Sequence, residues 1–557
     1  MRARGIAAVM GGAALLVAQA AAAQPAVQQL GADFWAWRGT TQPASSDDIP
    51  RIVRPAGWVP DWSPAGVAAQ RRQLAAFEAR WQALEAAPRT VAEKVDYRLV
   101  GSALARVHWE MDHVAAWRRQ PHFYTAQALN PVFEVLLPPP PVARPRLEEV
   151  IRLLANAPAI LAAGRANLDD LRGPFVDVAL SQLAEVPESL RGMAAGLDAY
   201  ADAGQKKRLK AVLDKAIAAF ADYAAFLKSK RAGLSEQTAV GRESYRYFLG
   251  NVGIYPYTPE QLVAMGRQEW ARSVLFETLE RNRNAGLPEL PIGPSIGAVT
   301  ARLDAEELKV RRFLTEKNLL TVPGWVGHYK AQPFPAYLAP IGWLGRTFDF
   351  TSIDRTGQDA TVYLPDPSPK LGYFNLSIMR DPRPIIVHEG VPGHFFQLSL
   401  SWRNPDPLRR RYYDSGANEG TGFYAEEMML QAGFWADAPK TREIIYNFAR
   451  LRALRVEVDV KLALGEFTIA QAADYLERMV PMDRATAREE ATFFAAAPGQ
   501  AISYQIGKMQ TTEFLAEARV REGKSFDLKR FHDYLWTNGN VPIALQKEEY
   551  LSMVSGE

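Results

Sequence analysis

Residues 387–394 place two histidines and a glutamate beside an apolar run, and this is the composition of a catalytic zinc site. His388 and Glu389 are adjacent, and His394 follows His388 by six positions. Zinc in hydrolases is typically held by neutral imidazoles and a carboxylate, with one position left for water whose proton a nearby glutamate accepts. The chain has only 7 histidines, so their grouping here indicates metal chemistry.

The spacing of the two histidines differs from that of an ordinary zincin helix, where ligands four residues apart share one face. A straight helix would separate His388 and His394 by roughly 120°. Pro392 and Gly393 lie between them and allow the helix to kink or bulge, so that both imidazoles could face one ion. The structural alternative is that His388 caps a buried strand end and His394 lies in a turn.

A third metal ligand is expected downstream, where residues 415–427 contain several glutamates. Glu419 and Glu426 are seven residues apart, which is two helical turns, so both fall on one face of a helix. One of them could bind the metal while the other orients a ligand. A glutamate at a helix start is also explained by the helix dipole, but the upstream motif favours Glu419 as a ligand.

Three motifs follow one another along the chain. They are His388-Glu389-x-x-Pro392-Gly393-His394, then Asn418-Glu419-Gly420 with Tyr424-Ala425-Glu426, then Pro498-Gly499-Gln500-Ala501-x-Ser503-Tyr504-Gln505-Ile506-Gly507. In this order they resemble the bacterial family catalogued as domain of unknown function 885 (DUF885), which is similar to all-α zinc peptidases of the gluzincin kind. The resemblance implies a helical fold with a deep groove. It also implies one zinc ion held by His388, His394 and Glu419, with Glu389 as the base.

Two positions depart from the family pattern. The residue after the second histidine, often another histidine, is Phe395, and Ala463 stands where many relatives carry a histidine. Because the three motifs are intact, metal binding is still expected, whereas substrate choice could differ.

Further residues near these motifs could assist the chemistry. A phenol beside the metal can donate a hydrogen bond to the developing oxyanion, and Tyr504 is the candidate, although it could equally be a packed aromatic residue. Arg452 is the candidate for binding a carboxylate of the substrate. Arg455 and Asp459 are four residues apart, and this spacing predicts a structural ion pair that supports the site.

The N-terminus and the composition limit where the protein acts. Arg2 and Arg4, an apolar stretch and a small-residue cleavage site predict a signal peptide over residues 1–23, so the mature protein is expected to be periplasmic or secreted. The sequence has no cysteine, which argues against a lipid attachment site or a disulfide framework. The formal net charge of +3 gives no indication of a nucleic-acid partner, and no later apolar run reaches the roughly 18 residues of a membrane span.

Apolar residues at helical spacing predict a helical array in the N-terminal half. The predicted helices are Ala65–Ala86, Val91–Trp117, Arg146–Leu171, Val176–Tyr200 and Gln205–Arg231. Thr258, Pro259 and Gln261 predict the start of another helix that ends near Asn282. Turn-rich residues after it favour a boundary between an N-terminal helical subdomain, residues 24–290, and a metal-site catalytic subdomain, residues 291–557.

The pattern changes between Thr321 and Ile378, where Ala360–Leu364 and Gly372–Ile378 are predicted to be strands. The expected fold is therefore mostly α, with a small β-hairpin or sheet near the metal-site helix. The edge of Gly372–Ile378 could bind a substrate backbone, or the segment could be an ordinary hairpin packed on helices.

These observations favour an exported zinc metallopeptidase that hydrolyses short peptides, in the manner of a carboxypeptidase or dipeptidase. Glu389 would accept a proton from water and pass it to the leaving amine. A metal-dependent amidase or esterase would use the same residues, and a non-catalytic periplasmic binding protein would lack the metal. Iron and manganese also suit two histidines and a carboxylate. The other histidines are expected to be core or surface residues: His108, His113, His122, His328 and His532.

Overall fold

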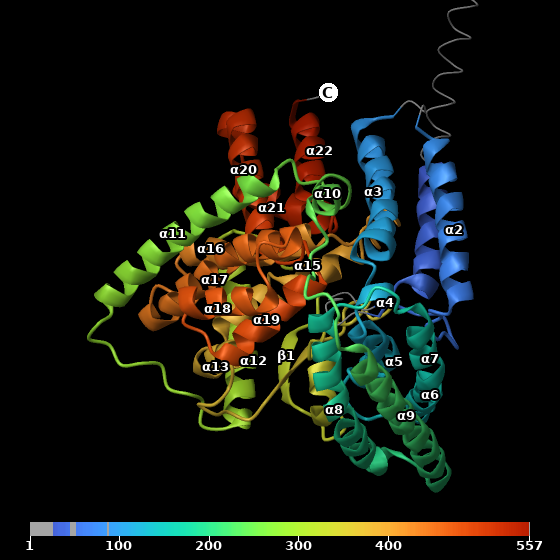
Figure 1. Cartoon of the computed structure of the whole chain (residues 1–557). Coiled ribbons are helices and arrows are strands. Elements are labelled where there is room, and N and C mark those ends of the chain that lie inside the picture. Colours follow the sequence, from blue (N-terminus) through green and yellow to red (C-terminus); the bar gives the residue numbers. More distant parts are fainter. Residues whose placement is uncertain (1–25, 45–51, 86–88, 556–557) are drawn as a thin grey trace, which may run out of the picture.

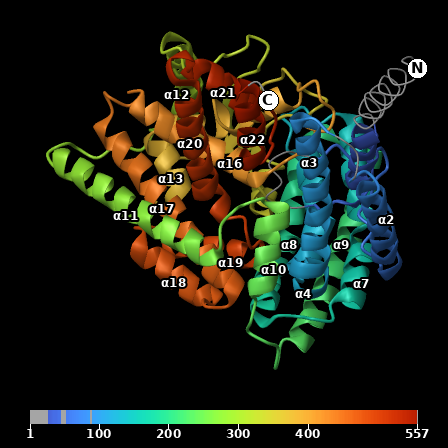
Figure 2. The ribbon, with the colours of Figure 1, turned by 90° about the horizontal axis from the view of Figure 1, so that it is seen from above.

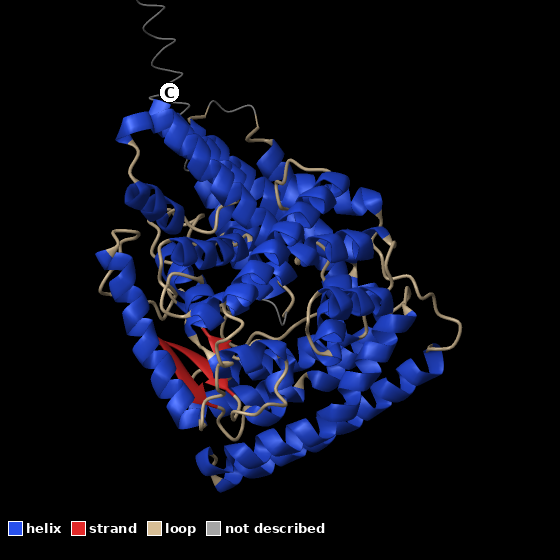
Figure 3. Ribbon diagram, turned by 90° about the vertical axis from the view of Figure 1, so that its left-hand side faces the viewer, coloured by secondary structure: helices blue, strands red, loops and turns tan. Residues whose placement is uncertain are grey.

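The computed structural model describes residues 26–44, 52–85 and 89–555. The predicted signal peptide, residues 1–23, lies outside them. Helices make up most of the described chain, and a three-stranded sheet lies among them (Figures 1 and 3). This confirms the prediction of a mostly α fold with a small sheet.

The N-terminal half is a helical array, drawn in blue to green on one side of Figure 1. A helix over residues 26–41 precedes the labelled elements. These are α2 (Pro64–Gln82), α3 (Val91–His108), η1 (Trp109–Val114), α4 (Ala116–Arg119), α5 (His122–Leu136), α6 (Arg144–Ala155), α7 (Ala157–Asn167), α8 (Gly173–Leu197), η2 (Asp198–Tyr200), α9 (Ala203–Lys230), α10 (Arg242–Tyr247) and η3 (Phe248–Val252).

Most of the helices predicted here are present, but their bounds differ. The predicted helix Val91–Trp117 is α3 followed by η1 and α4, and Ala115 between the last two has a left-handed backbone with a φ of 47°. The predicted helix Arg146–Leu171 is two helices, α6 and α7, with Asn156 between them. Pro158 lies in the first turn of α7, where proline is favoured because the first amides of a helix need no intrahelical partner. Helix α5 was not predicted, and it has Pro131 inside it.

The array has an apolar core, to which its long helices contribute stripes of side chains. In α9 the buried apolar residues recur every three or four positions, from Leu209 through Leu213, Ala216, Phe220 and Tyr223 to Leu227, which is the spacing of a single helical face. Leu338 and the short helix η4 (Ala339–Leu344) pack into the same core from the second half of the chain.

Helix α11 (Pro259–Arg283) begins where the sequence predicts. The Thr258 side chain accepts a hydrogen bond from the amide of Gln261, and the Gln261 side chain accepts one from the amide of Thr258. The helix lies along α17 (Pro439–Leu464) in Figure 2, where Arg267 and Glu457 form an ion pair at 2.6 Å. The division at residue 290 remains a prediction, and α11 packs on the half that follows it.

The second half contains twelve further helical elements among the described residues. They are α12 (Ile296–Glu316), α13 (Tyr373–Arg380), α14 (Arg383–Ile385), η5 (Ile386–Gly390), α15 (His394–Ser401), α16 (Ser415–Gln431), α18 (Ile469–Met479), α19 (Arg484–Ala496), α20 (Ile502–Glu522), η6 (Gly523–Ser525), α21 (Leu528–Thr537) and α22 (Ile543–Ser555). Among the described residues, none of the helices combines the length and the apolar character that a transmembrane span requires.

The sheet consists of β1 (Tyr329–Pro333), β2 (Phe348–Asp349) and β3 (Ala360–Leu364) in the order β1-β3-β2. Strand β1 runs parallel to β3 and β2 antiparallel to it, so the predicted strand Ala360–Leu364 is confirmed as the central one. The predicted strand Gly372–Ile378 is wrong. That segment starts α13, whose first amide, on Tyr373, donates to the Asp483 carboxylate at 3.0 Å.

Carboxylates of α12 occupy part of the outer edge of β1. Glu307 accepts a hydrogen bond from the amide of Tyr329 at 3.3 Å, and Asp304 accepts one from the amide of Ala331 at 3.2 Å. These two amides are therefore already paired, and they are not open to an added substrate strand.

Candidate metal centre

The His-Glu motif lies across a break between two helices. His388 and Glu389 lie in the π-helical turn η5, which ends at Gly390; Val391 is extended, and His394 begins α15. A side chain at Gly393 would place its Cβ 1.7 Å from the carbonyl oxygen of His388. Only glycine fits at that position, so the sharp reversal that joins the two ligand-bearing elements depends on it.

The residue before this glycine is held in place by the C-terminal helices. The indole nitrogen of Trp536, a fully buried residue of α21, donates a hydrogen bond to the carbonyl oxygen of Pro392 at 2.6 Å. The segment between the two histidines is therefore fixed from outside the motif.

The three predicted ligands converge on one point. The Nε2 atoms of His388 and His394 lie 3.3 and 3.1 Å from Oε2 of Glu419. The candidate ligand atoms all lie within 4.8 Å of one another, and all three residues are buried. Neither the strand-end cap nor the turn considered as structural alternatives for the histidines is present.

These separations are compatible with a zinc ion. With metal–ligand bonds near 2.0–2.1 Å, neighbouring ligand atoms of a tetrahedral zinc site lie roughly 3.3 Å apart. Both separations between histidine and Glu419 are close to that value, and two imidazoles with one carboxylate are a donor set that zinc accepts. His388, His394 and Glu419 could therefore hold a metal ion.

Glu426 supports His388 from the side away from Glu419. Its carboxylate lies 2.7 Å from Nδ1 of His388 and 2.9 Å from a guanidinium nitrogen of Arg452. A carboxylate on the second nitrogen of a ligating histidine fixes the tautomer and the ring orientation. Arg452 thus lies behind the ligands, and this placement does not support its predicted contact with a substrate carboxylate.

Charge couples these buried groups. Burial alone would lower the pKa of His388, but Glu419 and Glu426 outweigh burial and raise it to about 9. Burial would raise the pKa of Glu419, yet the two imidazoles hold it well below its usual range. The two carboxylates therefore favour positive charge at this place, and a metal cation would supply it in exchange for a proton.

Helix α20 approaches α16 closely enough to bring Tyr504 to the site. A Cβ on Gly420 would lie 2.5 Å from Cα of Gly507, so the two helices meet at glycines. The Tyr504 ring lies nearly parallel to the His388 ring, with centroids 6.2 Å apart. The structure thus brings Tyr504 beside a candidate ligand, as a phenol that assists hydrolysis would require.

Arg455 and Asp459 do not form the predicted ion pair. Arg455 makes two hydrogen bonds to Glu490 of α19, each at 2.7 Å, and its guanidinium lies 4.7 Å from the centre of the Tyr504 ring. Helix α17 is buried on all sides near these residues, so each side chain finds its partner on a different element. Arg455 supports the site by packing under Tyr504.

Asp459 instead anchors the start of α20. Its carboxylate accepts hydrogen bonds from the amides of Gly499 at 2.8 Å and Ala501 at 2.7 Å, and from the Tyr245 hydroxyl at 3.0 Å. Burial raises the pKa of Asp459 to about 6 despite these donors. Because Tyr504 lies in the first turn of that helix, Asp459 helps to position it.

Glu389 is the predicted site residue that meets solvent. Its side chain is 14% exposed, and a carboxylate oxygen lies 3.9 Å from Nε2 of His394. The side chains of the three ligands are 4% exposed or less. Glu389 therefore lies where a water molecule and a substrate would reach the centre.

Two neighbours of the ligands were not predicted. The Phe350 ring lies against His394 with centroids 6.4 Å apart, and Gly422 of α16 leaves room for both imidazoles, since a Cβ there would lie 3.1 Å from His394 and 3.3 Å from His388. Phe350 has no motif around it. The spacing of Gly422 from Glu419 places it on the ligand face of α16, and this was a usable signal.

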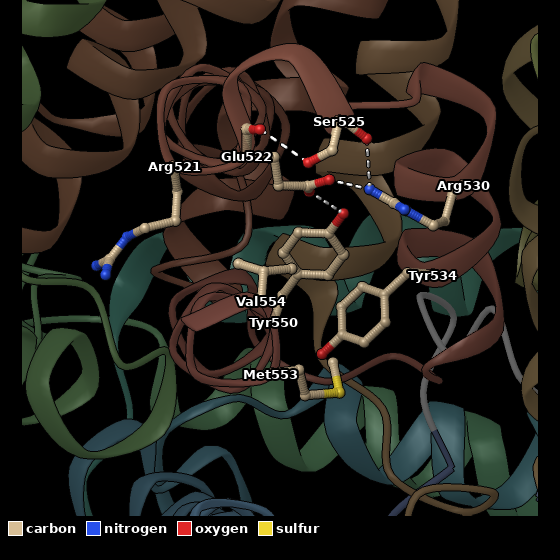
Figure 4. Close-up of a pocket in the computed structure, with 8 residues that line it drawn as sticks. All are labelled: Arg521, Glu522, Ser525, Arg530, Tyr534, Tyr550, Met553 and Val554. Carbon is tan, nitrogen blue, oxygen red and sulfur yellow. Dashed lines mark hydrogen bonds and ion pairs between the residues drawn. The ribbon is translucent and has the colours of Figure 1, made fainter. Parts of the chain in front are cut away.

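A separate cavity lies between the ends of α20, α21 and α22 (Figure 4). Its volume is about 530 Å³, and its lining contains none of the predicted site residues: Arg521, Glu522, Ser525, Arg530, Tyr534, Tyr550, Met553 and Val554. Glu522 pairs with Arg530 and accepts a hydrogen bond from Tyr550 at 2.5 Å. These polar groups satisfy one another, so the cavity gives no chemical reason to assign a ligand.

Comparison with other proteins identifies the fold but no activity. A solved structure from Shewanella oneidensis, described as a "putative lipoprotein of unknown function", is 19% identical with a TM-score of 0.68. A second, described as the "putative lipoprotein" from Colwellia psychrerythraea, is 16% identical with a TM-score of 0.72. Each match covers 96% of this chain and 99% of the other. Among curated proteins no relative matches.

A family model provides the assignment that these structures do not. The model described as "Bacterial protein of unknown function (DUF885)" matches residues 51–309 and 373–549. These stretches cover more than half of the sequence and contain His388, His394 and Glu419. The chain therefore belongs to the DUF885 family of bacterial proteins.

Proposed function

We propose that this protein is a zinc-dependent hydrolase that cleaves the peptide bonds of short peptides. The observation that carries the proposal is the convergence of His388 and His394 on one oxygen of Glu419, with Glu389 beside them. The relationship to gluzincin peptidases that the resemblance to DUF885 implies supports the same reaction class. Zinc, when bound, would polarise the scissile carbonyl and activate a water molecule.

Glu389 supplies the proton transfer. It lies next to His394 and is the most exposed carboxylate of the centre, so a water molecule can reach it. A carboxylate in this position accepts a proton from the attacking water and then donates it to the leaving amine. This transfer contributes about 10²–10⁴-fold to the rate in typical enzymes.

Tyr504 supplies a hydrogen-bond donor for the oxygen of the tetrahedral state. Its ring packs between His388 and Arg455, which restricts its orientation. A preorganised donor is effective because it needs no rearrangement when negative charge develops.

The depth of the site favours small substrates. All three candidate ligands are buried. Helices α16 and α20 and the segment that contains Phe350 lie around them. A short peptide or an extended terminus can enter such a site more readily than a folded chain. The predicted signal peptide and the neighbours described as lipoproteins support export to the periplasm or beyond.

The experiment that tests this proposal combines metal analysis with peptide hydrolysis. The mature chain should contain about one zinc per molecule by mass spectrometry, and His388→Ala, His394→Ala and Glu419→Ala should each lose it. Glu389→Gln should retain zinc but lose roughly 10²–10⁴-fold in the hydrolysis of a mixed di- and tripeptide library. Glu427→Gln is the matched control, since Glu427 pairs with Lys508 and Arg272 at 2.7 Å.

Different failures separate the alternatives. Zinc binding without peptide hydrolysis, together with cleavage of cell-wall amides or esters, would establish the amidase or esterase alternative. A chain that binds no metal even when zinc is supplied would be a binding protein. Full activity in Glu389→Gln would exclude the proposed proton transfer.

A further inference from the structure

Tyr329 carries a buried hydroxyl that the fold leaves unsatisfied. The residue is the first of β1 and is fully buried, and its hydroxyl has no hydrogen-bond partner among the residues that the structure describes. An unpaired buried hydroxyl destabilises the folded state, and such groups are rare enough to require a reason.

The Tyr329 ring lies against the end of η5, the turn that carries His388 and Glu389. A Cβ on Gly390 would lie 2.8 Å from Cδ1 of Tyr329, and Gly390 directly follows Glu389. On its other side the ring is 6.3 Å from Phe350, which in turn lies against His394. Tyr329 therefore belongs to the wall of the centre on the side of Glu389.

The electrostatic surroundings keep the phenol neutral. Burial, and after it the nearby carboxylate of Glu389, raise the pKa of Tyr329 well above its usual value. At neutral pH the hydroxyl is therefore a hydrogen-bond donor without an acceptor in the protein.

Tyr363 is a second buried tyrosine of the same sheet, and its hydroxyl has a hydrogen-bond partner. It lies in β3 and is as deeply buried, but its hydroxyl donates to the carbonyl oxygen of Leu137 at 3.0 Å. The contrast indicates that the missing acceptor of Tyr329 is not a general property of this sheet.

We propose that Tyr329 is a substrate-binding residue whose hydroxyl donates a hydrogen bond to a backbone carbonyl oxygen of the bound peptide on the Glu389 side of the metal centre. Carbonyl oxygens are the acceptors that every peptide offers, so the contact requires an acyl group but no particular side chain. This inference rests on the proposed peptidase function and specifies one part of its substrate contact.

The place of Tyr329 in the chain adds a consequence for specificity. Tyr329 and Phe350 lie in residues 310–372, between the two stretches that the family model matches. The metal ligands and the base lie inside the matched stretches. The sheet thus supplies substrate contacts from a segment separate from the one that supplies the chemistry.

The test compares Tyr329→Phe with Tyr363→Phe in the mature protein. The probe is an acetyl-leucyl-alanyl-alanine analogue in which a tetrahedral phosphinate replaces the leucyl-alanyl amide, so that an intact amide carbonyl remains on each side of it. Its affinity is measured by calorimetry. Tyr329→Phe should bind the probe roughly three- to tenfold more weakly, the effect of one lost hydrogen bond. Tyr363→Phe should bind it like the wild type, and both variants should retain zinc.

Thermal unfolding of the metal-free proteins gives a second readout that needs no activity. Tyr329→Phe removes an unpaired hydroxyl and should unfold at the wild-type temperature or above it, whereas Tyr363→Phe loses a hydrogen bond and should unfold at a lower temperature. Unchanged affinity in Tyr329→Phe, or a loss of stability equal to that of Tyr363→Phe, would overturn the assignment. If the wild-type protein holds zinc but neither binds the phosphinate nor cleaves peptides, the proposed peptidase function is excluded. The proposed contact of Tyr329 with a peptide is then excluded as well.

Discussion

The helical array of the N-terminal half and the metal centre bury very different groups. Helix α9 buries a stripe of leucine, alanine and aromatic side chains, whereas α16 buries Glu419 and Glu426 against His388. Apolar burial stabilises a fold directly, but buried charges are retained only where partners compensate for their lost hydration. The first region supplies stability, and the second uses that stability to hold ionisable groups in place.

Truncating the array core should give the largest change in stability. Phe220 is fully buried in α9, and Phe220→Ala should lower the free energy of unfolding by about 3–5 kcal/mol through lost contacts and a cavity. Urea unfolding followed by circular dichroism measures the change, with Leu308→Ala as control because Leu308 is 50% exposed. Reduced zinc content in the folded Phe220→Ala protein would show that the two regions are not independent.

The carboxyl of Asp459 should make stability depend on pH. Its pKa is raised from 3.8 to about 6, so the folded state binds a proton more tightly than the unfolded chain, and stability falls as pH rises through this window. Compared with Asp459→Asn, the wild type should lose up to about 3 kcal/mol of unfolding free energy between pH 4 and pH 7. A difference that stays constant over this range would mean that the hydrogen bonds from Tyr245, Gly499 and Ala501 keep Asp459 ionised throughout.

Changing the support of His388 should affect the metal rather than the fold. Glu426→Gln should weaken zinc binding by about 10–100-fold, because the carboxylate that orients the imidazole becomes an amide. Competition with a chromogenic chelator measures the affinity. The adjacent Glu427→Gln should bind zinc like the wild type; equal losses in both variants would assign the effect to the charge of the helix and not to the contact with His388.

A change far from both regions should give the smallest effect. Thr258→Ala removes the side-chain cap of α11 and should lower the free energy of unfolding by about 1 kcal/mol. Zinc content and peptide hydrolysis should stay at wild-type levels. A loss of activity in Thr258→Ala would show that the placement of α11 affects the metal centre through its packing on α17.

Local sequence signals predicted the array better than the region between the two halves. Capping at Thr258 and apolar spacing in α9 are properties of a few neighbouring residues, and both were found where expected. Helix α13 was predicted to be a strand because its apolar residues alternate, and the group that caps it, Asp483, lies 110 residues away. A contact of this kind cannot be recognised in a local window.

The site shows the same limit. The spacing of Glu419 and Glu426 indicated a shared helical face, and the structure places both carboxylates on His388. The spacing of Arg455 and Asp459 indicated a pair, yet this part of α17 is buried on all sides, and each residue binds a different element. Periodicity locates a face only when the helix has an exposed side. Tyr329 and Phe350 reach the centre through the sheet, and no residue pattern near them marked that position.

The hydrogen bond from Trp536 to Pro392 affects how the sequences of truncated homologues should be interpreted. A shortened protein that ends before α21 would still contain His388, His394 and Tyr504, together with Glu389 and Glu419. A motif search would score such a protein as intact. It would lack the indole that fixes the turn between the histidines. In such fragments, the presence of every ligand in the sequence is not sufficient evidence that a metal can be bound.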